Sequence, residues 1–295
     1  VVDSIQTMQS TELDAHPGSL SQIRECTRLL MRQAKTFDVP LVLAGHVTKE
    51  GDIAGPRVLE HMVDVVLSLE GERMTSLRLL RGLKNRFGST SEVGVFQMEN
   101  QGLVEVADPS RIFIQERQPD AIGSVLLATL EGTRTLLMEV QALTVPSAGT
   151  APRRIANGID FNRLLLITSV LGQRQHIPLG SQDVIVSVAG GLRVAEPAAD
   201  LGIALAIASS FRNIPIHQDF AAIGEVGLSG EVRSVPEIDH RLGELLRLGV
   251  RRCLVPARGF DGINPRVGIE VIPVQHLREA LALAFPRPSV KDKRV

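Results

Sequence analysis

The chain has 295 residues, and its 32 Lys and Arg against 33 Asp and Glu give a formal net charge of −1. This length is enough for two domains, and a hydrophobic content of 44% excludes a mostly disordered chain. The near-zero charge argues against a wholly basic nucleic-acid-binding surface but leaves room for a local basic patch. The two cysteines, Cys26 and Cys253, are too few and too far apart in sequence for a zinc site or a disulfide framework.

No apolar run approaches the ~18 residues of a membrane span, and no charged-then-apolar signal segment opens the chain. We therefore expect a cytoplasmic protein without a membrane partner. Because the chain begins with Val1 rather than Met, we also expect that it starts in the middle of a fold.

The first hundred residues predict an α/β pattern. Val1 to Asp3 is typical of the end of a buried strand, and a capping box at Ser19 to Gln22 begins a helix that runs to Phe37. A second buried strand is expected at Leu41 to Ala44. From Val63 the apolar spacing indicates a meander of four strands, at 63–69, 75–81, 93–98 and 103–106.

A polar stretch at 108–121 predicts a linker, after which an α/β pattern restarts and runs to 286. Strands are expected at 124–129, 136–143, 183–187, 223–226, 252–255 and 269–272. Helices are expected at 161–171, 197–210, 238–248 and 275–285. Residues 287–295 form a charged tail that we expect to fray.

Asp3 is the first candidate functional residue, because a carboxylate at the carboxyl end of a buried strand faces the crevice where α/β sheets bind ligands. In phosphoryl-transfer enzymes this position, called Walker B, holds Mg²⁺. The alternative is an Asp that only caps a turn. The phosphate-cradling G-x-x-x-x-G-K-[ST] loop of such enzymes does not occur in the chain.

Two further segments are candidates for phosphate binding. Arg73 to Ser91 holds five basic residues and no acid, and its centre is the turn Lys84-Asn85-Arg86-Phe87-Gly88. Such a turn can contact the phosphates of DNA or of a nucleotide, or it can be a solvated hairpin tip. The glycine-rich loop 46–57 follows a strand, at a place where binding loops occur. It carries Lys49 and Arg57, and His46 either senses a phosphate or caps the strand.

These segments, in this order and spacing, resemble the bacterial RadA (Sms) family of DNA repair proteins. The shared motifs are Asp3-Ser4-Ile5-Gln6-Thr7, Gly45 to Gly51 and Lys84 to Gly88. The resemblance implies a RecA-like, hexameric ATPase that acts on single-stranded and branched DNA during recombinational repair, with a recombinase of the RecA type as partner. It implies ATP and Mg²⁺ as cofactors, with zinc only in an N-terminal finger that this sequence does not contain.

Carried over by position, the resemblance makes Asp3 the Walker B ligand of Mg²⁺ and His46 a sensor of the γ-phosphate. It makes Lys49 and Arg57 contacts to DNA. Lys84 and Arg86 become residues that reach across a subunit boundary to the neighbour's ATP. The implied fold class is α/β, with a truncated RecA-like ATPase core at 1–107, the linker at 108–121 and a Lon-protease-like α+β domain at 122–286.

The second domain resembles Lon-type proteases around Gly224 to Val232, yet it lacks their Ser-Lys dyad. Ala198 stands where the nucleophilic Ser is expected, and Asp239 stands at about the position of the Lys. Since Ala has no nucleophilic atom, peptidase activity requires another Ser, such as Ser187 or Ser209. Three functions therefore remain: a DNA-repair ATPase that is inactive without a phosphate-binding loop, a non-catalytic oligomeric DNA-binding platform, and a Lon-like peptidase.

Overall fold

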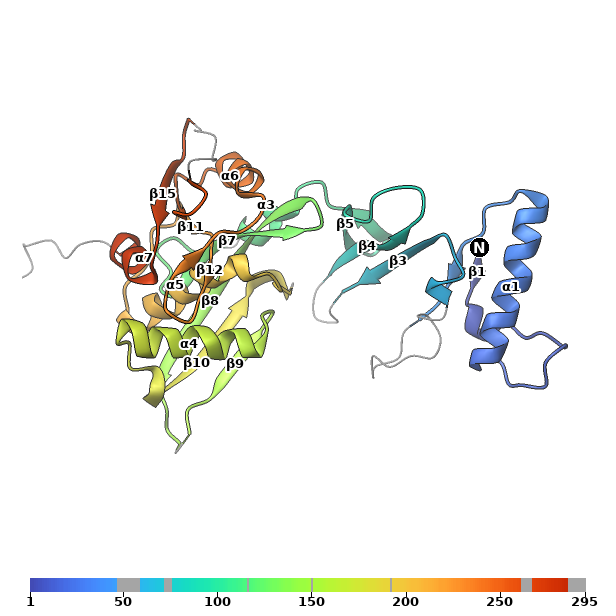
Figure 1. The fold of residues 1–295 in the computed structure, drawn as a ribbon, viewed down its shortest axis with the longest axis horizontal. Coiled ribbons are helices and arrows are strands. Elements are labelled where there is room, and N and C mark those ends of the chain that lie inside the picture. Colours follow the sequence, from blue (N-terminus) through green and yellow to red (C-terminus); the bar gives the residue numbers. More distant parts are fainter. Residues whose placement is uncertain are drawn as a thin grey trace, which may run out of the picture. The chain divides into compact units, whose positions relative to one another are not determined.

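The computed structural model describes residues 1–46, 59–71, 76–115, 117–149, 151–191, 193–260 and 267–285. The chain divides into two compact units. Unit 1 comprises Val1–Leu69 and Leu80–Ser91, and unit 2 comprises Glu70–Leu79 and Glu92–Val295. Figure 1 shows the elements along the chain. The α/β class that the sequence predicts is confirmed.

Unit 1 begins with strand β1 (Val2–Asp3) and a 3-10 turn, η1 (Ile5–Thr7), followed by helix α1 (Leu20–Phe37) and strand β2 (Leu43–Ala44). The Ser19 side chain caps α1 by accepting a hydrogen bond from the Gln22 backbone N–H, as the capping box predicts. The Gln22 side chain does not bond back to the Ser19 backbone but contacts the loop before the helix.

Strands β1 and β2 are not buried as predicted. Val2, Leu43 and Ala44 are half-buried and Asp3 is exposed, because among the described residues only these two short strands form the sheet. A small core of Ile5, Ile23 and Cys26 packs beneath α1.

The predicted meander is present as a four-stranded sheet in the order β3-β4-β5-β6. Its strands are β3 (Val65–Glu70), β4 (Leu77–Asn85), β5 (Val93–Glu99) and β6 (Gly102–Glu105). The predicted linker differs from expectation, because Pro109–Gln115 forms helix α3. Phe113 is buried there, and the helix packs against β8. Local polarity suggested a linker, but this tertiary contact stabilises a helix.

Unit 2 is built on a seven-stranded sheet in the order β15-β14-β11-β7-β8-β10-β9. Strands β15, β14, β11 and β7 pair in parallel, β8 is antiparallel to both of its neighbours, and β9 pairs in parallel with β10. The strands are β7 (Ser124–Glu131), β8 (Arg134–Pro146), β9 (Arg154–Asn157), β10 (Gln182–Val188), β11 (Phe220–Ala222), β14 (Arg252–Pro256) and β15 (Glu270–Val274). A separate hairpin joins β12 (Glu225–Val226) and β13 (Val232–Arg233).

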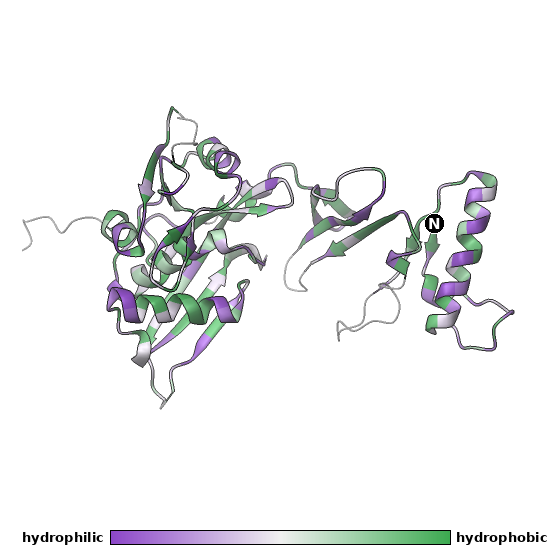
Figure 2. Cartoon of the chain, viewed as in Figure 1, coloured by the Kyte–Doolittle hydropathy of each residue, from purple (hydrophilic) through white to green (hydrophobic). Residues whose placement is uncertain are grey.

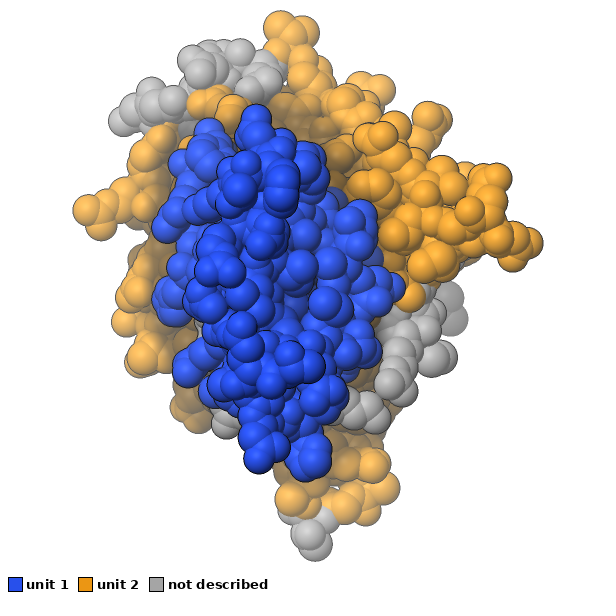
Figure 3. All heavy atoms as spheres, turned by 90° about the vertical axis from the view of Figure 1, so that its right-hand side faces the viewer, with its two compact units in different colours: residues 1–69, 80–91 blue, residues 70–79, 92–295 orange. Residues whose placement is uncertain are grey.

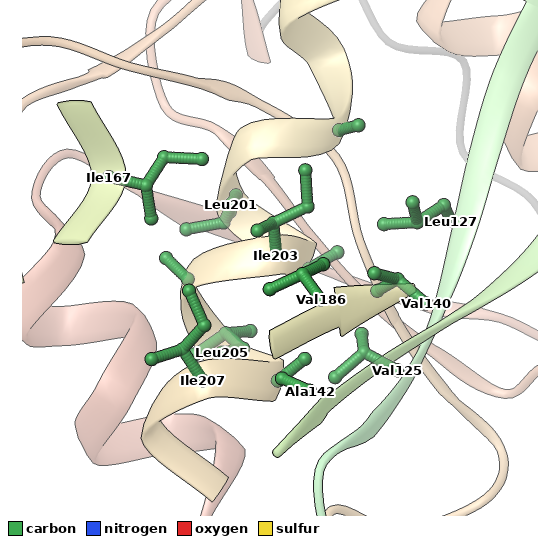
Figure 4. Packing of buried hydrophobic residues seen from close by; sticks show 14 of the residues in the cluster. Val125, Leu127, Val140, Ala142, Ile167, Val186, Leu201, Ile203, Leu205 and Ile207 are labelled. Carbon is green, nitrogen blue, oxygen red and sulfur yellow. The ribbon is translucent and has the colours of Figure 1, made fainter. Parts of the chain in front are cut away.

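The helices of unit 2 cover both faces of this sheet. They are α4 (Phe161–Gln175), α5 (Asp200–Arg212), α6 (Ile238–Arg247) and α7 (Leu277–Ala284), with short 3-10 turns η2 (Leu179–Ser181), η3 (Ala189–Gly191) and η4 (Pro197–Ala199). Successive side chains of β7 point to opposite faces of the sheet. Val125 and Leu127 belong to the core with α4, α5 and α7. Leu126 and Ala128 belong to the core with α6. Figure 4 shows the first of these cores.

Cys253 belongs to the α6 core, and burial raises the pKa of its thiol. This cysteine is therefore a residue of the hydrophobic core. Within the described ranges, every helix is too short or too polar to cross a membrane. The predicted tail at 287–295 lies outside the described residues.

Candidate functional site

Asp3 lies at the carboxyl edge of a pair of parallel strands. Strand β1 pairs in parallel with β2, so that Asp3 stands beside Ala44, the residue before Gly45 and His46. The Asp3 side chain is exposed. Because the carboxyl ends of parallel strands meet at one edge of a sheet, the structure brings Asp3 and His46 to the same edge.

The backbone of His46 is held by the turn that follows Asp3. The Nε2 of Gln6 donates a hydrogen bond to the His46 carbonyl at 3.2 Å. A Cβ at Gly45 would come within 3.3 Å of that same Nε2 and within 3.6 Å of Ile5 Cγ2. A side chain at position 45 would therefore crowd η1, and glycine allows β2 and η1 to approach closely.

Lys84, at the end of β4, is bound within unit 1. Its Nζ donates to the carbonyl oxygens of Glu60 at 2.6 Å and Val63 at 2.9 Å, and the residue is half-buried. An ammonium group has three donors, so one N–H remains for a further acceptor.

Arg86 forms an ion pair with Asp64 over a distance of 2.8 Å. The Arg86 backbone N–H also donates to the Asp64 carbonyl at 3.1 Å. Asn85 shapes the turn, because its Oδ1 accepts from Phe87 N at 3.0 Å and its Nδ2 donates to the Ser89 carbonyl at 3.3 Å. The Phe87 ring is left 82% exposed. Sequence reasoning missed Asp64, although an acid just before a strand that precedes a basic turn is a visible signal.

The sequence-derived sites form two groups. Asp3 and His46 share one strand edge, while Lys84 and Arg86 are anchored on residues 60–64. In the part of the chain that the structure describes, no hydrogen bond or ion pair joins the two groups. The predicted DNA contacts Lys49 and Arg57 lie outside the described residues. No cluster of three or more metal-ligating side chains occurs among the described residues, so Asp3 offers a single carboxylate.

In unit 2, the positions of the Lon-type dyad contain no nucleophile. Ala198 lies buried in η4, and its carbonyl accepts from Gly224 N at 2.9 Å. Ser209 does not replace it, since it is fully buried and its Oγ accepts from Gly123 N at 2.9 Å and donates to the Ile214 carbonyl at 2.6 Å.

An ion pair instead connects the two segments that would carry the dyad. Glu196, two residues before Ala198, accepts two hydrogen bonds from Arg241, two residues after Asp239, at 2.7 and 2.6 Å. Arg241 is fully buried and also donates to the Ala128 and Pro236 carbonyls. Every nitrogen of the guanidinium group thus has a partner, as a buried charge requires.

A second buried ion pair joins α4 and α5. Arg163 binds the carboxylate of Asp200 through two hydrogen bonds of 2.7 and 2.6 Å, and Val226 N donates to the same carboxylate at 3.0 Å. Burial raises the pKa of Asp200 to about 6, although these hydrogen bonds and the charge of Arg163 lower it. The negative charge of a further carboxylate, Glu225, also raises the pKa of Asp200.

Eight arginines of unit 2 could contact phosphates by their charge, but most of them are used inside the protein. The side chains of seven of them donate hydrogen bonds to carboxylates or backbone carbonyl oxygens: Arg153, Arg154, Arg163, Arg174, Arg241, Arg247 and Arg252. Arg241 is excluded as a phosphate contact by its burial. Arg251 is exposed, and its side chain forms no hydrogen bond or ion pair within the described ranges.

Known proteins match this chain over most of its length. It is 52% identical over 281 residues to the DNA repair protein RadA of Bacillus subtilis (strain 168), a match that covers 95% of this chain and 61% of the relative. It is 47% identical over 285 residues to the DNA repair protein RadA of Streptococcus pneumoniae, covering 97% of this chain and 68% of the relative. The corresponding protein of Listeria monocytogenes is 46% identical over 286 residues.

A family model described as subunit ChlI of Mg-chelatase matches residues 167–259, which lie within unit 2. The chain spans about three fifths of the length of the Bacillus relative. The comparisons therefore cover both units, but not the whole of the relatives.

Proposed function

Because this chain belongs to the RadA family of DNA repair proteins, we propose that it forms part of a DNA-dependent ATPase of recombinational repair. In this role it promotes branch migration and the processing of recombination intermediates on single-stranded DNA. The observation that carries the proposal is the position of Asp3 beside Ala44, the residue before Gly45 and His46, at the carboxyl edge of parallel strands. We place this activity in the cytoplasm.

Asp3 and His46 are the residues that would face the nucleotide. Mg²⁺ is commonly held by one or two carboxylates together with substrate phosphates, so the single carboxylate of Asp3 fits this ion. When bound, the ion neutralises charge on the phosphates. Asp3 would hold it directly or through water, and His46 would donate a hydrogen bond toward the γ-phosphate.

Lys84 and Arg86 would act on the nucleotide of a neighbouring subunit in a homo-hexamer. Their anchors on residues 60–64 support this role, because two of the three Lys84 donors and one Arg86 nitrogen hold the side chains while other donors stay available. Cations fixed in this way would stabilise the charge that develops on the transferred phosphoryl group.

The remaining parts of the proposal come from the family resemblance. Lys49 and Arg57 would contact single-stranded DNA, and a recombinase of the RecA type would be the partner. Residues 1–107 would belong to a RecA-like core, and residues 122–286 would form a Lon-like domain without peptidase activity. The ion pair between Glu196 and Arg241 supports this view of the second domain, since it joins the two dyad segments without supplying a nucleophile.

A chimera tests the ATPase assignment. This chain is grafted in place of the matching segment of the Bacillus subtilis relative, and phosphate release is measured with and without single-stranded DNA. We expect DNA-stimulated hydrolysis that Asp3→Ala lowers by about a hundredfold or more, while the exposed carboxylate control Asp14→Ala leaves it unchanged. Equal rates in the two variants would refute the assignment.

The alternative is a non-catalytic, oligomeric DNA-binding platform. It is favoured by one observation, the absence of G-x-x-x-x-G-K-[ST] from the 295 residues. The chain by itself should therefore hydrolyse ATP negligibly. Turnover at ordinary ATPase rates that Asp3→Ala abolishes would contradict this expectation, and hydrolysis of casein by the purified chain would support a peptidase instead.

A further inference from the structure

Helix α1 has two chemically opposite faces. Its buried residues are Gln22, Ile23, Cys26 and Thr27. Four cations lie three or four residues apart along the helix, and all are exposed: Arg24, Arg28, Arg32 and Lys35. At 3.6 residues per turn, this spacing confines them to an arc of about 80°, turned away from the buried face. Figure 2 shows hydrophilic residues recurring along α1. We call these four residues the α1 stripe.

The α1 stripe is neutralised only in part by acids, because the charge of Glu25 acts on Arg28 and Arg32 and that of Glu12 on Arg28. Glu25 is the one carboxylate of α1, so four cations against one acid leave the helix with a net charge of +3. Glu25 pairs with Arg28, whose guanidinium lowers the pKa of that carboxyl. Arg24, Arg32 and Lys35 make no hydrogen bond or salt bridge within the described part of the chain. Their charge is therefore available to an anionic partner.

A hollow of about 560 Å³, open to solvent, adjoins the stripe. It is lined by Arg28, Met31, Arg32, Lys35, Thr36 and Met62. Two of these lining residues, Met31 and Met62, are apolar, and no aromatic ring is among them. Figure 3 shows unit 1 from the side on which α1 lies.

We propose that the α1 stripe and its hollow bind the phosphate backbone of duplex DNA. This inference rests on the proposed function in DNA repair and adds contacts by residues other than Lys49 and Arg57, the predicted single-strand contacts. Cations four residues apart on a helix are about 6 Å apart along its axis, so the stripe offers a row of charges to successive phosphates.

The hollow has no aromatic side chains, and this favours duplex DNA over a single strand as its ligand. Binding of single strands relies on aromatic side chains on which unpaired bases stack. The hollow contains none, and the chain has no Trp or Tyr at all. Contacts to backbone phosphates alone require no exposed bases, and a duplex presents these phosphates in a regular row.

Salt dependence of binding tests the proposal with the full chain. Anisotropy of a fluorescein-labelled 20-base-pair duplex gives the affinity over a series of KCl concentrations. Arg32→Ala should lower the slope of log affinity against log salt by about one, and Arg32→Ala with Lys35→Ala by about two. The control Gln33→Glu changes the net charge by the same −1 as Arg32→Ala, on a neighbouring exposed position outside the stripe, and should leave the slope unchanged. Circular dichroism at 222 nm checks that each variant is folded.

Four results would overturn the proposal. The first is an unchanged slope in Arg32→Ala, and the second is an equal loss of slope in Arg32→Ala and Gln33→Glu, which indicates a general electrostatic field. The third is a matching loss of slope with a 20-nucleotide single strand. The fourth is binding of poly-glutamate in preference to the duplex. If the unmodified chain binds the single strand but the stripe variants leave the salt slope for the duplex unchanged, this inference fails and the proposed function stands. If the unmodified chain binds neither DNA, the DNA-binding part of the proposed function fails with it.

Discussion

Arg241 is the largest of the fully buried side chains, and its partner Glu196 is one-fifth exposed. Replacing Arg241 by Met leaves the carboxylate of Glu196 without its two charged hydrogen bonds. We expect Arg241→Met to lower the free energy of unfolding of unit 2 by about 3–5 kcal/mol. Urea unfolding followed by circular dichroism at 222 nm measures this, since the chain lacks Trp and Tyr for fluorescence.

The double variant Arg241→Met with Glu196→Gln is the control, because it removes both charges. It should lose clearly less stability than Arg241→Met alone. A loss of under about 1 kcal/mol in the single variant would mean that the ion pair is not required where the structure places it.

Asp200 gives a pH dependence of stability whose sign follows from its raised pKa. The folded state holds the proton of Asp200 up to about pH 6, while an unfolded Asp releases it near 3.8. Between these values the folded state binds more protons, so this contribution to stability is complete below pH 4 and is lost as the pH rises to 6. A difference of this size corresponds to roughly 3 kcal/mol.

The comparison with Asp200→Asn isolates this contribution, because other titrating groups act equally in both proteins. We expect the unfolding free energy of the unmodified chain, relative to the variant, to fall between pH 4 and pH 7. The measurement is urea unfolding at unit steps of pH. A difference that rises over this range would show that Arg163 outweighs burial and holds the Asp200 pKa low.

At the scale of one element, Gln22 joins α1 to the loop that precedes it. Its Oε1 accepts from Ser10 N at 2.8 Å, and its Nε2 lies within 3.1 Å of the carbonyl oxygens of Ser10, Leu13 and Ala15. Gln22→Leu removes all of these bonds. The amide of Ser10 should then exchange its hydrogen at least about tenfold faster, as measured by mass spectrometry or NMR.

Ser19→Ala is the matched control for Gln22→Leu. It removes the N-cap and costs about 1 kcal/mol of helix stability, but leaves the loop bonds in place. If Ser10 exchanges at the same rate in Gln22→Leu as in the unmodified chain, the side chain of Gln22 does not hold the loop.

Elements with a strong local signal were predictable from the sequence. Helix α1 begins at its capping Ser, and the alternating strands β3 to β6 lie within a few residues of the predicted ranges. Strands β9 and β11 were missed, because each has only three or four residues and is defined by parallel pairing with a distant strand. Helix α3 was missed because burial of Phe113, rather than local spacing, stabilises it.

The candidate site was predictable only in part for the same reason. Asp3 ends one strand of the sheet and His46 closely follows the other, so their common edge can be inferred from the order of elements. The carbonyl oxygens that bind Lys84, and the pairing of Arg86 with Asp64, depend on how residues 60–64 approach the turn. The contacts between these two segments depend on the fold and cannot be predicted from the sequence alone.

For the whole molecule, the two units differ greatly in the cores that hold them together. The buried core of unit 1 consists of Ile5, Ile23 and Cys26, with Met8, Leu30 and Leu59 packed against it. Unit 2 has a core on each face of its sheet. Since stability grows with buried apolar area, we expect two thermal transitions, with unit 1 unfolding at the lower temperature.

Differential scanning calorimetry resolves these transitions, and limited proteolysis assigns them. Between the two transition temperatures, trypsin should cleave after Arg28 or Arg32 in α1, while a fragment that retains both segments of unit 2, Glu70–Leu79 and the chain from Glu92 onward, persists. Destabilising each unit separately gives the control: Gln22→Leu should lower only the first transition, and Arg241→Met only the second. A single transition with equal calorimetric and van't Hoff enthalpies, shifted by both variants, would show instead that the chain unfolds as one cooperative body.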